Sequence, residues 1–276
     1  MADVLIIGSG GREDALRQAM LASPEVGRAE IYGDAEAGRQ AFIGSKDVFS
    51  IVGPEAAIAD GASDFLREAG HVVLGVSEEA ARYEAKKSVA IKTVPDLFPH
   101  TNIKEGRDMA SDALAFIESE DSRTYYIKAD GFAGGKGSVK PESKEHAKAV
   151  VEGMIAGDFD GAGKEIINFQ ELCDGPEVSP IAVVGRGGEF ILLPYAQDHK
   201  KLYNGDKEPN TGGTGAYTPV PESIVSMADN QQIEEMIATA LDKMSSSGIP
   251  LEQGVLYAGV IKALNLDKIK VGELQT

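Results

Sequence analysis

Residues 197 to 219 bring acidic, basic, imidazole and glycine residues together in a segment with few side chains to bury. Gly212, Gly213 and Gly215 would let successive backbone N–H groups converge on an anion. Charged side chains of both signs precede them, which suits a zwitterion or a phosphate. We therefore predict a loop that binds a small polar ligand, the alternative being an ordinary solvated loop. The expected contributors are Asp198, His199, Lys200, Asn210, Thr211, Gly212 and Gly213.

A second glycine-rich segment, residues 128 to 137, follows an apolar strand and precedes Val139. A Walker phosphate loop would need Gly-Lys-Ser/Thr opening directly into a helix, but here Lys136 is followed by another glycine. The plan of strand, glycine loop and strand instead favours a flap whose backbone amides cover phosphates while Lys128 supplies a point charge. The predicted nucleotide contacts in this flap are Lys128, Gly131, Gly134, Gly135, Lys136 and Gly137.

Composition limits the partners. With 27 Lys and Arg against 44 Asp and Glu, the net charge is −17, so nucleic acid and anionic membranes are not expected to bind. No apolar run approaches the roughly 20 residues of a membrane helix. The single cysteine, Cys173, cannot form an internal disulfide, and the first residues do not resemble a signal peptide, which together predict a cytoplasmic setting.

The first 80 residues alternate predicted strands and helices, which is typical of an α/β domain with a parallel sheet. Strands are expected at residues 4–7, 29–32, 49–52 and 72–74, and helices at about 12–22 and 55–69. The dinucleotide fingerprint Gly-x-Gly-x-x-Gly is incomplete because its last position is Glu13. A phosphate at the N-terminus of the first helix remains reasonable. The residues predicted to meet it are Gly8, Gly10, Gly11, Arg12 and Glu13.

The remaining residues mix helices with strands in an α+β pattern. We expect helices at about 78–94, 142–155 and 228–246, and strands at 166–173, 189–194, 255–264 and 270–275. Glu273 and Gln275 are two residues apart on the last strand, so both side chains point to one face.

Eight motifs in the same order make the chain resemble phosphoribosylamine–glycine ligase, an ATP-grasp family of purine synthesis. They are Gly8-Ser-Gly-Gly-Arg-Glu13, Val52-Gly-Pro-Glu55, Lys128-Ala-Asp-Gly131, Gly135-Lys-Gly137, Gln197-Asp-His-Lys200, Pro209-Asn-Thr-Gly-Gly213, Gly215-Ala-Tyr217 and Leu256-Tyr-Ala-Gly259. The resemblance implies an ATP-grasp fold over residues 81–276, with a lid at about 101–169. A small parallel-sheet substrate domain would precede it at 1–80.

The resemblance also implies roles for single residues. Lys87 would contact ATP, the backbone of Glu171, Leu172 and Cys173 would hold adenine, and Glu177 would bind the ribose hydroxyls. Glu273 and Gln275 would hold Mg²⁺, or Mn²⁺, on the phosphates. The implied reaction is phosphorylation of the glycine carboxylate by ATP, followed by attack of the phosphoribosylamine nitrogen, with the residues around Asp198 at the reacting end.

Four features depart from the family pattern. Asp14 replaces a histidine, the stretch between Tyr32 and Val52 is short, Gln275 replaces an asparagine, and the sequence ends at Thr276 where the family continues. Three alternatives therefore stay open: a shortened ligase that a second polypeptide would complete, a ligase for a different amine or amino acid, and a nucleotide-binding homologue without turnover.

Overall fold

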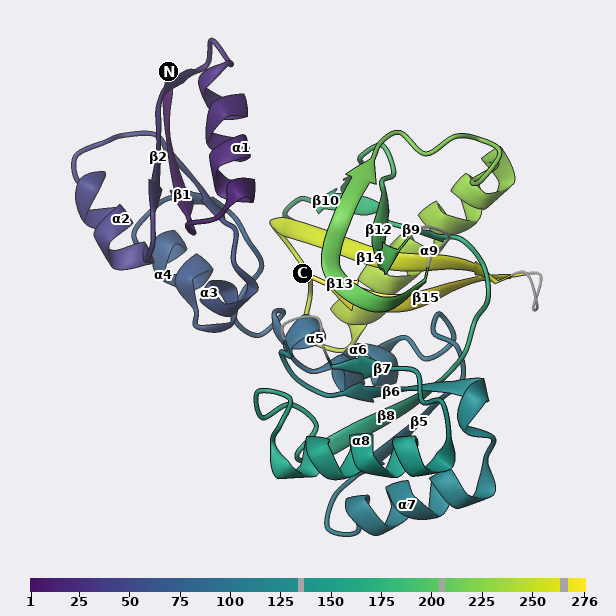
Figure 1. The fold of residues 1–276 in the computed structure, drawn as a ribbon. Helices are drawn as coiled ribbons and strands as arrows, with labels where there is room; N and C mark the ends of the chain where they lie inside the picture. Colours follow the sequence, from purple (N-terminus) through teal and green to yellow (C-terminus); the bar gives the residue numbers. More distant parts are fainter. Residues whose placement is uncertain (134–136, 204–206, 264–267) are drawn as a thin grey trace.

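The computed structural model describes residues 1–133, 137–203, 207–263 and 268–276. Its N-terminal unit is a sheet of four parallel strands in the order β2-β1-β3-β4 (Figure 1). The strands are β1 (Ala2–Ile7), β2 (Val26–Tyr32), β3 (Val48–Val52) and β4 (Val72–Leu74), and the helices that connect them are α1 (Gly11–Leu21), α2 (Ala35–Ala41), α3 (Glu55–Ala59) and α4 (Ala62–Glu68). The expected parallel sheet is confirmed.

Apolar residues on both faces of β1 explain this arrangement. Val4 and Ile6 pack with Leu16 and Met20 of α1, whereas Leu5 joins the larger core on the opposite face. A strand that is apolar on successive residues is typical of a parallel sheet covered on both sides.

Two predicted helices are each broken in the structure. The helix expected at 55–69 divides into α3 and α4 because Gly61 adopts a left-handed conformation, with φ of 82°. The helix expected at 78–94 divides into α5 (Arg82–Ala85) and α6 (Lys87–Thr93), because Lys86 is extended, with φ of −133°. The second break makes Lys87 the first residue of a new helix.

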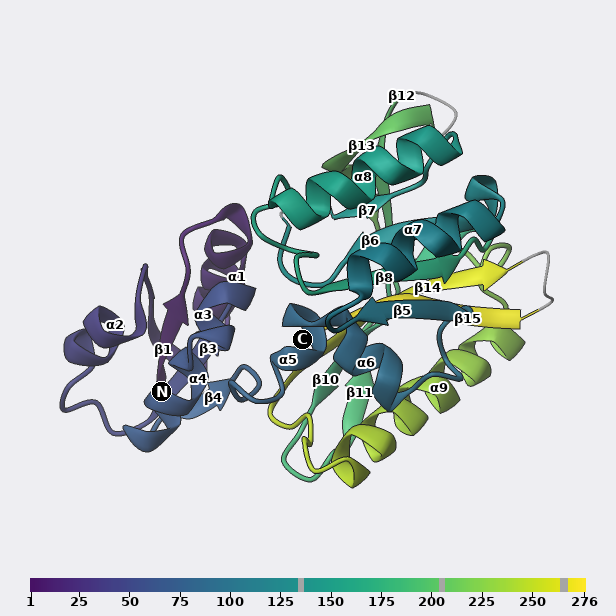
Figure 2. The same cartoon turned by 90° about the horizontal axis from the view of Figure 1, so that it is seen from below.

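A four-stranded antiparallel sheet in the order β5-β8-β6-β7 occupies the segment expected to be the lid, and the name lid is kept for it below. Its strands are β5 (Thr101–Glu105), β6 (Tyr125–Ala129), β7 (Ser138–Val139) and β8 (Ile166–Glu171), and its helices are α7 (Met109–Ser119), the short 3-10 helix η1 (Ser122–Thr124) and α8 (Lys144–Ala156). Helices α7 and α8 cover one face of this sheet (Figure 2). The Ser143 hydroxyl accepts a hydrogen bond from the His146 N–H at 3.2 Å and so caps α8.

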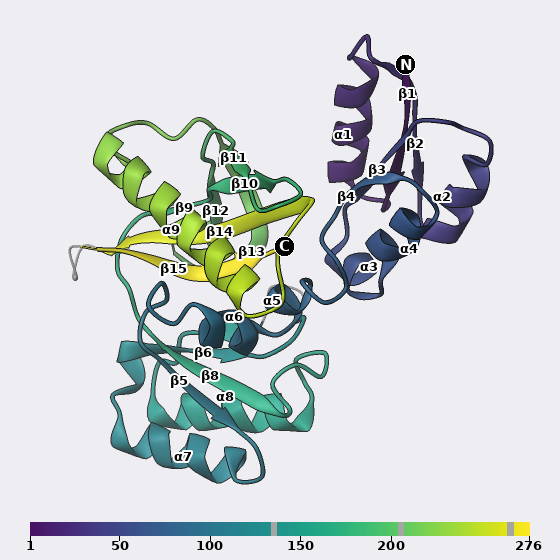
Figure 3. The same ribbon diagram turned by 180° about the vertical axis from the view of Figure 1, so that it is seen from behind.

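The C-terminal sheet has the strand order β11-β10-β14-β15, and β9 also pairs with β14. These strands are β9 (Glu177–Val178), β10 (Ile181–Val184), β11 (Phe190–Leu192), β14 (Gly254–Ala263) and β15 (Lys268–Gln275), and α9 (Met227–Ser246) packs on one face (Figure 3). Ser226 and Asp229 form a capping box that starts α9. The predicted long amphipathic helix is therefore confirmed.

The segment predicted as a ligand loop is largely an antiparallel ribbon. It consists of β12 (Gln197–Tyr203) and β13 (Lys207–Tyr217), on the side of the C-terminal sheet opposite α9 (Figures 1 and 3). The pairing has irregular register between His199 and Lys201 and again up to Tyr203. Among the described residues, none of the helices is both long enough and apolar enough to cross a membrane.

Candidate functional site

The lid sheet and the C-terminal sheet face one another, and Lys128 connects them. Its Nζ, carried by β6, donates a hydrogen bond to the Gly272 carbonyl of β15 at 2.9 Å. The alternation of β6 puts Ile127 in the apolar core under α7 and α8, so Lys128 necessarily points to the opposite face, toward the C-terminal sheet. The predicted phosphate-binding lysine thus lies between the two sheets.

Two amide side chains share this face of the lid and were missed by the sequence reasoning. Asn168 and Gln170 of β8 are opposite Lys128 and Tyr126 in the sheet. Both are buried, with 0% and 3% of their surface exposed, yet Asn168 Oδ1 and Gln170 Nε2 have no hydrogen-bond partner among the described residues. Buried amides of this kind normally have partners. The signal in the sequence was the alternation of polar and apolar residues at 166–171.

The base of the predicted flap is tightly packed. Gly131 has φ of 128°, and a Cβ at this position would lie 3.0 Å from the Ala162 Cβ. Gly137 is equally restricted, because its Cβ would lie 2.7 Å from that of Ala133. These two glycines serve close packing of the loop as well as any contact with phosphate. Gly134, Gly135 and Lys136 lie outside the described residues.

Lys87 is brought to the same flap from α6. Its Nζ donates to the Gly131 carbonyl at 3.2 Å. The neighbouring Ser88 bonds to Asp130 through both its backbone N–H and its hydroxyl. Lys87 and Lys128, 41 positions apart in the chain, therefore both adjoin the flap.

Strand β8 covers most of the segment that we predicted as the hinge strand. The Glu171 N–H donates to the His100 carbonyl at 2.8 Å, and the Leu172 N–H donates to the Thr124 carbonyl at 2.8 Å. The amides of Glu171 and Leu172 therefore already have acceptors within the protein. For the predicted contact with adenine, the next amide along the chain, that of Cys173, is the better candidate. Burial raises the pKa of the half-buried Cys173 thiol. The thiol is thus a weak nucleophile at neutral pH.

Glu177 and Glu273 converge above Gly259. A Cβ built on Gly259 would lie 2.9 Å from Glu177 Oε1 and 2.9 Å from Glu273 Cγ. Gly259 therefore leaves the space in which two carboxylates meet. Gln275 lies two residues beyond Glu273, and the intervening Leu274 is buried, so the predicted alternation on β15 holds.

Glu84 lies beside this group. Its carboxylate accepts a hydrogen bond from the Thr276 N–H at 2.9 Å. Burial, chiefly, and the nearby charges of Glu55 and Glu273 raise the pKa of Glu84 to about 7, although the Thr276 amide and Lys87 act in the opposite direction. The sequence reasoning did not single out Glu84, because Glu55, Glu273 and Thr276, which surround it, come from two distant parts of the chain.

The first glycine turn encloses a carboxylate. Glu13 is only 3% exposed, and it accepts hydrogen bonds from the Gly10 N–H at 2.7 Å and from Arg12 Nε at 2.9 Å. Burial acts to raise the pKa of Glu13, but these hydrogen bonds outweigh it and the pKa is lowered. A Cβ on Gly8, Gly10 or Gly53 would approach the Glu13 side chain to 2.6, 2.9 and 2.2 Å respectively.

This geometry changes the interpretation of the predicted phosphate contacts. Glu13 itself takes the Gly10 amide, so Gly8 and Gly10 make room for that side chain. Arg12 is 60% exposed at its side chain and donates to the Gly53 carbonyl, while Gly11 has open space around it. Arg12 and Gly11 are therefore the better candidates for an anion.

The ribbon holds the other predicted substrate residues. The His199 ring stacks on Tyr217, with 5.9 Å between ring centroids, and the Thr214 hydroxyl donates to the His199 carbonyl. Asp198 is half-buried and pairs with Ala216 across the ribbon. Thr211 is on β13, as are Asn210, Gly212 and Gly213, while Lys200 is on β12. The surroundings of Lys200, Asn210, Gly212 and Gly213 lie outside what the structure describes.

Comparisons with known proteins match this arrangement. Residues 88–274 match the family model described as phosphoribosylglycinamide synthetase, ATP-grasp (A) domain. The chain belongs to this family. A phosphoribosylamine–glycine ligase of Streptococcus pyogenes is 34% identical over 99% of this chain and 68% of its own length. The human trifunctional purine biosynthetic protein adenosine-3 is 37% identical over 97% of this chain but only 28% of its own.

Solved structures agree on the fold. The phosphoribosylamine–glycine ligase of Thermotoga maritima superposes with a TM-score of 0.79 at 27% identity, covering 99% of this chain and 68% of that one. A D-alanine–D-alanine ligase from Bacillus anthracis, solved with ATP, has a TM-score of 0.66 at 9% identity, which shows a likeness of fold alone. The fold is therefore the expected ATP-grasp fold behind a parallel-sheet N-terminal unit. The chain spans 68% of the length of the Streptococcus pyogenes and Thermotoga maritima ligases and 28% of the length of the human protein.

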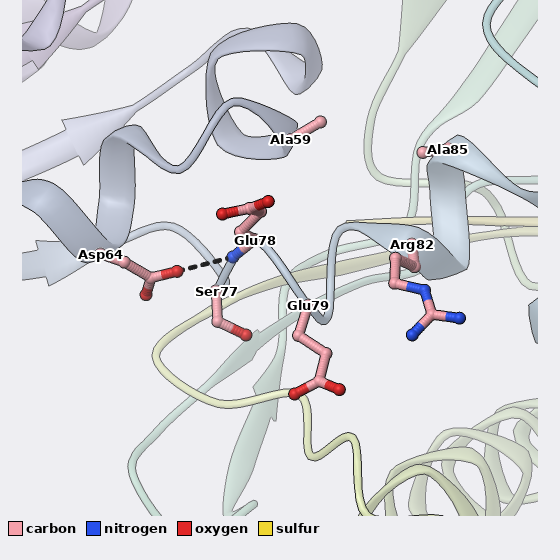
Figure 4. A pocket seen from close by; sticks show the side chains of 7 residues that line it. All are labelled: Ala59, Asp64, Ser77, Glu78, Glu79, Arg82 and Ala85. Atoms are coloured by element: carbon pink, nitrogen blue, oxygen red, sulfur yellow. Dashed lines mark hydrogen bonds between the residues drawn. The ribbon is translucent and has the colours of Figure 1, made fainter.

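A separate cavity of about 530 Å³ lies where the N-terminal unit passes into α5 (Figure 4). It is lined by Ala59, Asp64, Ser77, Glu78, Glu79, Arg82 and Ala85, none of which we predicted as a site residue. Three carboxylates and one guanidinium make it poorly suited to a phosphate. The Asp64 carboxylate already accepts the Glu78 N–H at 2.8 Å.

Proposed function

We propose that this chain acts as an ATP-dependent ligase that joins glycine to phosphoribosylamine. The main support is the distribution of charge across the space between the two sheets. Lys128 reaches from the lid to the Gly272 carbonyl of β15, and Glu177 and Glu273 meet above Gly259 on the same C-terminal sheet. A lysine in the same region as two carboxylates suits a magnesium–polyphosphate complex, because the lysine can bind phosphate oxygens and the carboxylates can bind the metal.

The proposed chemistry has two steps. A carboxylate oxygen of glycine attacks the γ-phosphorus of ATP, and ADP leaves. The amine nitrogen then attacks the acyl carbon, the bond from carbon to the phosphate oxygen breaks, and the nitrogen loses a proton. No side chain needs to act as a nucleophile, because positioning and charge neutralisation suffice. In this proposal Lys128 and Lys87 orient the phosphates, and the ribbon around Asp198 holds the amino acid.

The side-chain oxygens of Glu177, Glu273 and Gln275 are of the right type for Mg²⁺ or Mn²⁺. Both ions prefer oxygen ligands, and Mg²⁺ is commonly held by one or two carboxylates plus substrate phosphates and water. Glu273 and Gln275 would hold the ion, with Glu177 beside them or on the ribose. When bound, the metal would neutralise charge on the phosphates.

A different amine substrate is the second candidate. Only α2 lies between β2 and β3, and the exposed Asp14 on α1 accepts a hydrogen bond from Gln18 at 2.7 Å. An acid in place of the family's histidine, next to the expected anion contact Arg12, would favour an amine with less negative charge than a ribosylamine phosphate.

The decisive experiment measures ADP release by the purified chain with ATP and magnesium, in the presence and absence of glycine. Ribosylamine phosphate and uncharged amines are then compared as acceptors. Glycine-dependent ADP release that requires the phosphorylated amine supports the proposal, and release with another amine supports the second candidate. Nucleotide binding without any turnover would refute both. Titration calorimetry with ATP provides a separate measure of nucleotide binding by the same protein.

A further inference from the structure

A carboxylate that the proposed reaction does not use lies at the base of the flap. Asp130 comes two residues after Lys128 and directly before Gly131. Its Oδ1 accepts a hydrogen bond from the Ser88 N–H at 2.7 Å, and its Oδ2 accepts one from the Ser88 hydroxyl at 2.9 Å. Ser88 lies in the first turn of α6, immediately after Lys87. Asp130 therefore fastens the flap to the helix that carries Lys87.

The surroundings of this contact are buried and well bonded. Ser88 is 2% exposed, and Asn168, which is fully buried, approaches Asp130 Oδ1 through its Nδ2 at 3.4 Å. The backbone of Asp130 is bonded on both sides, with its N–H to Ile166 and its carbonyl accepting the Gly163 N–H. A carboxylate at the start of a helix is also favoured by the helix dipole. These contacts fix the position of the base of the flap relative to α6.

The placement of Lys87 and Lys128, the two lysines expected to bind the phosphates, depends on this position of the flap base. Lys87 Nζ donates to the Gly131 carbonyl, directly after Asp130, while Lys128 reaches across to Gly272. If the base of the flap moved away from α6, the ammonium groups of Lys87 and Lys128 would move apart. They would then no longer bind the phosphates of one ATP molecule together. If both ammonium groups are already in place before ATP binds, less conformational entropy is lost on binding and the affinity for ATP is higher.

We infer that Asp130, together with Ser88, is a positioning residue for ATP: it holds the flap on α6 so that Lys87 and Lys128 act on the same phosphates. This inference rests on the proposed function. The plainer explanation is a helix cap that contributes only to stability. Asp229 offers a comparison at another helix start, because it accepts hydrogen bonds from the Ser226 N–H at 2.8 Å and the Ser226 hydroxyl at 2.7 Å on the far side of the C-terminal sheet. Asp229 differs in that it also forms an ion pair with Lys262 of β14 at 2.6 Å.

The experiment compares wild type, Asp130→Ala, Asp130→Asn, Ser88→Ala and Asp229→Asn. For each protein, ATP affinity is measured by calorimetry, and the rise in melting temperature on adding ATP is measured by scanning fluorimetry. We expect the Kd for ATP to rise about tenfold in Asp130→Ala and about threefold in the two milder variants. Asp229→Asn should melt at a lower temperature but keep the wild-type Kd and the full rise on adding ATP. With turnover, KM for ATP should rise in the Asp130 variants while KM for glycine stays constant.

Two results would overturn the inference. One is wild-type ATP affinity in Asp130→Ala, or in both milder variants if that protein does not fold. The other is an equal loss of affinity in Asp229→Asn, which would reduce Asp130 to a stabilising cap. Failure of the wild-type chain to bind ATP would instead refute the proposed function itself, and that outcome is visible before any variant is compared.

Discussion

Each of the two lysines assigned to phosphate donates to a backbone carbonyl of a facing element. Lys128 bonds to Gly272 and Lys87 bonds to Gly131. An ammonium group binds a phosphate oxygen more strongly than a carbonyl oxygen, because the phosphate carries a negative charge. A bound phosphate oxygen can therefore replace the Gly272 or the Gly131 carbonyl as the acceptor of each ammonium group.

Replacement of Lys128 by alanine should weaken ATP binding. The substitution removes a charge-assisted contact of about 1.5–3 kcal/mol, which corresponds to roughly a ten- to hundredfold rise in Kd. Titration calorimetry with ATP and magnesium measures the change, and Lys148→Ala on the outer helix α8 is the control. Equal affinities of wild type and Lys128→Ala would show that the nucleotide binds elsewhere.

Glu84 should make the protein less stable as pH rises. Its pKa of about 7 in the folded chain exceeds the ordinary 4.5, so the folded state binds the proton more tightly than the unfolded state. The free energy of unfolding therefore falls as pH rises from about 4.5 to 7, and the loss is complete above 7. Glu84→Gln, which never ionises, should gain about 1–3 kcal/mol relative to wild type over this interval.

Urea denaturation at a series of pH values tests this prediction, because the difference between the two proteins isolates the one group. Glu79→Gln, an exposed position five residues earlier, is the control and should show no comparable trend. A constant difference between Glu84→Gln and wild type from pH 5 to 8 would contradict the raised pKa.

At the scale of elements, the N-terminal glycine turn is organised by Glu13. The carboxylate joins the start of α1 to the end of β3 through Arg12, whose guanidinium bonds to the Gly53 carbonyl. Gly53 offers the tightest approach to Glu13, at 2.2 Å from a built Cβ to Oε1, and its Cβ would also lie 3.2 Å from the Ile7 carbonyl. The turn thus depends on glycine at a position outside the helix itself.

Gly53→Ala should therefore lower the free energy of unfolding by about 1–3 kcal/mol, as overpacking does. Gly33→Ala, with nothing within 4 Å of its built Cβ, is the control and should change stability by less than about 0.5 kcal/mol. In a Glu13→Ala background the cost of Gly53→Ala should shrink, because the clashing side chain is gone. An unchanged cost in that background would assign the strain to the Ile7 carbonyl instead.

Elements with strong local signals could be predicted from the sequence. The apolar run at residues 4–7 and the amphipathic pattern of α9 fix their structures locally, and the predictions hold to within a few residues. Breaks inside helices were missed, because Gly61 and Lys86 take their conformations from the packing of α4 and α6 against other elements. The ribbon at 197–217 was missed because its many glycine, charged and polar residues favour a loop, whereas the two consecutive segments pair as neighbouring strands.

The candidate site shows the same limit. Glycines and lysines of the two loops stand out by type and spacing, so Lys128 and Gly131 were predicted. Asp130 and Ser88 are 42 positions apart, and only the fold brings them within hydrogen-bond distance. Glu13 was assigned to phosphate because a glycine turn before a helix is typical of anion sites, but its own carboxylate occupies the Gly10 amide.

At the scale of the whole molecule, three parts meet around one region. The lid brings Lys128, the C-terminal sheet brings Glu177 and Glu273, and the ribbon is tied to the same strand as Glu177, because Gln197 Nε2 donates to the Glu177 carbonyl at 2.9 Å. The polyphosphate would thus lie between lid and sheet, with the amino acid at the ribbon beyond it. Substitutions in the flap should then change the binding of ATP, and substitutions in the ribbon should change the use of the amino acid.

Asp198→Asn tests this division. Asp198 lies on the ribbon, next to Gln197, and its negative charge suits the ammonium group of an amino acid better than a phosphate. The variant should bind ATP with a Kd within about twofold of wild type, because no nucleotide contact is removed, while glycine-dependent ADP release falls by about a hundredfold, as expected for loss of a charged contact of 1.5–3 kcal/mol. Asp242→Asn, exposed on α9, is the control for a simple change of charge. Weaker ATP binding in Asp198→Asn with glycine-dependent turnover retained would exchange the roles of the ribbon and the flap.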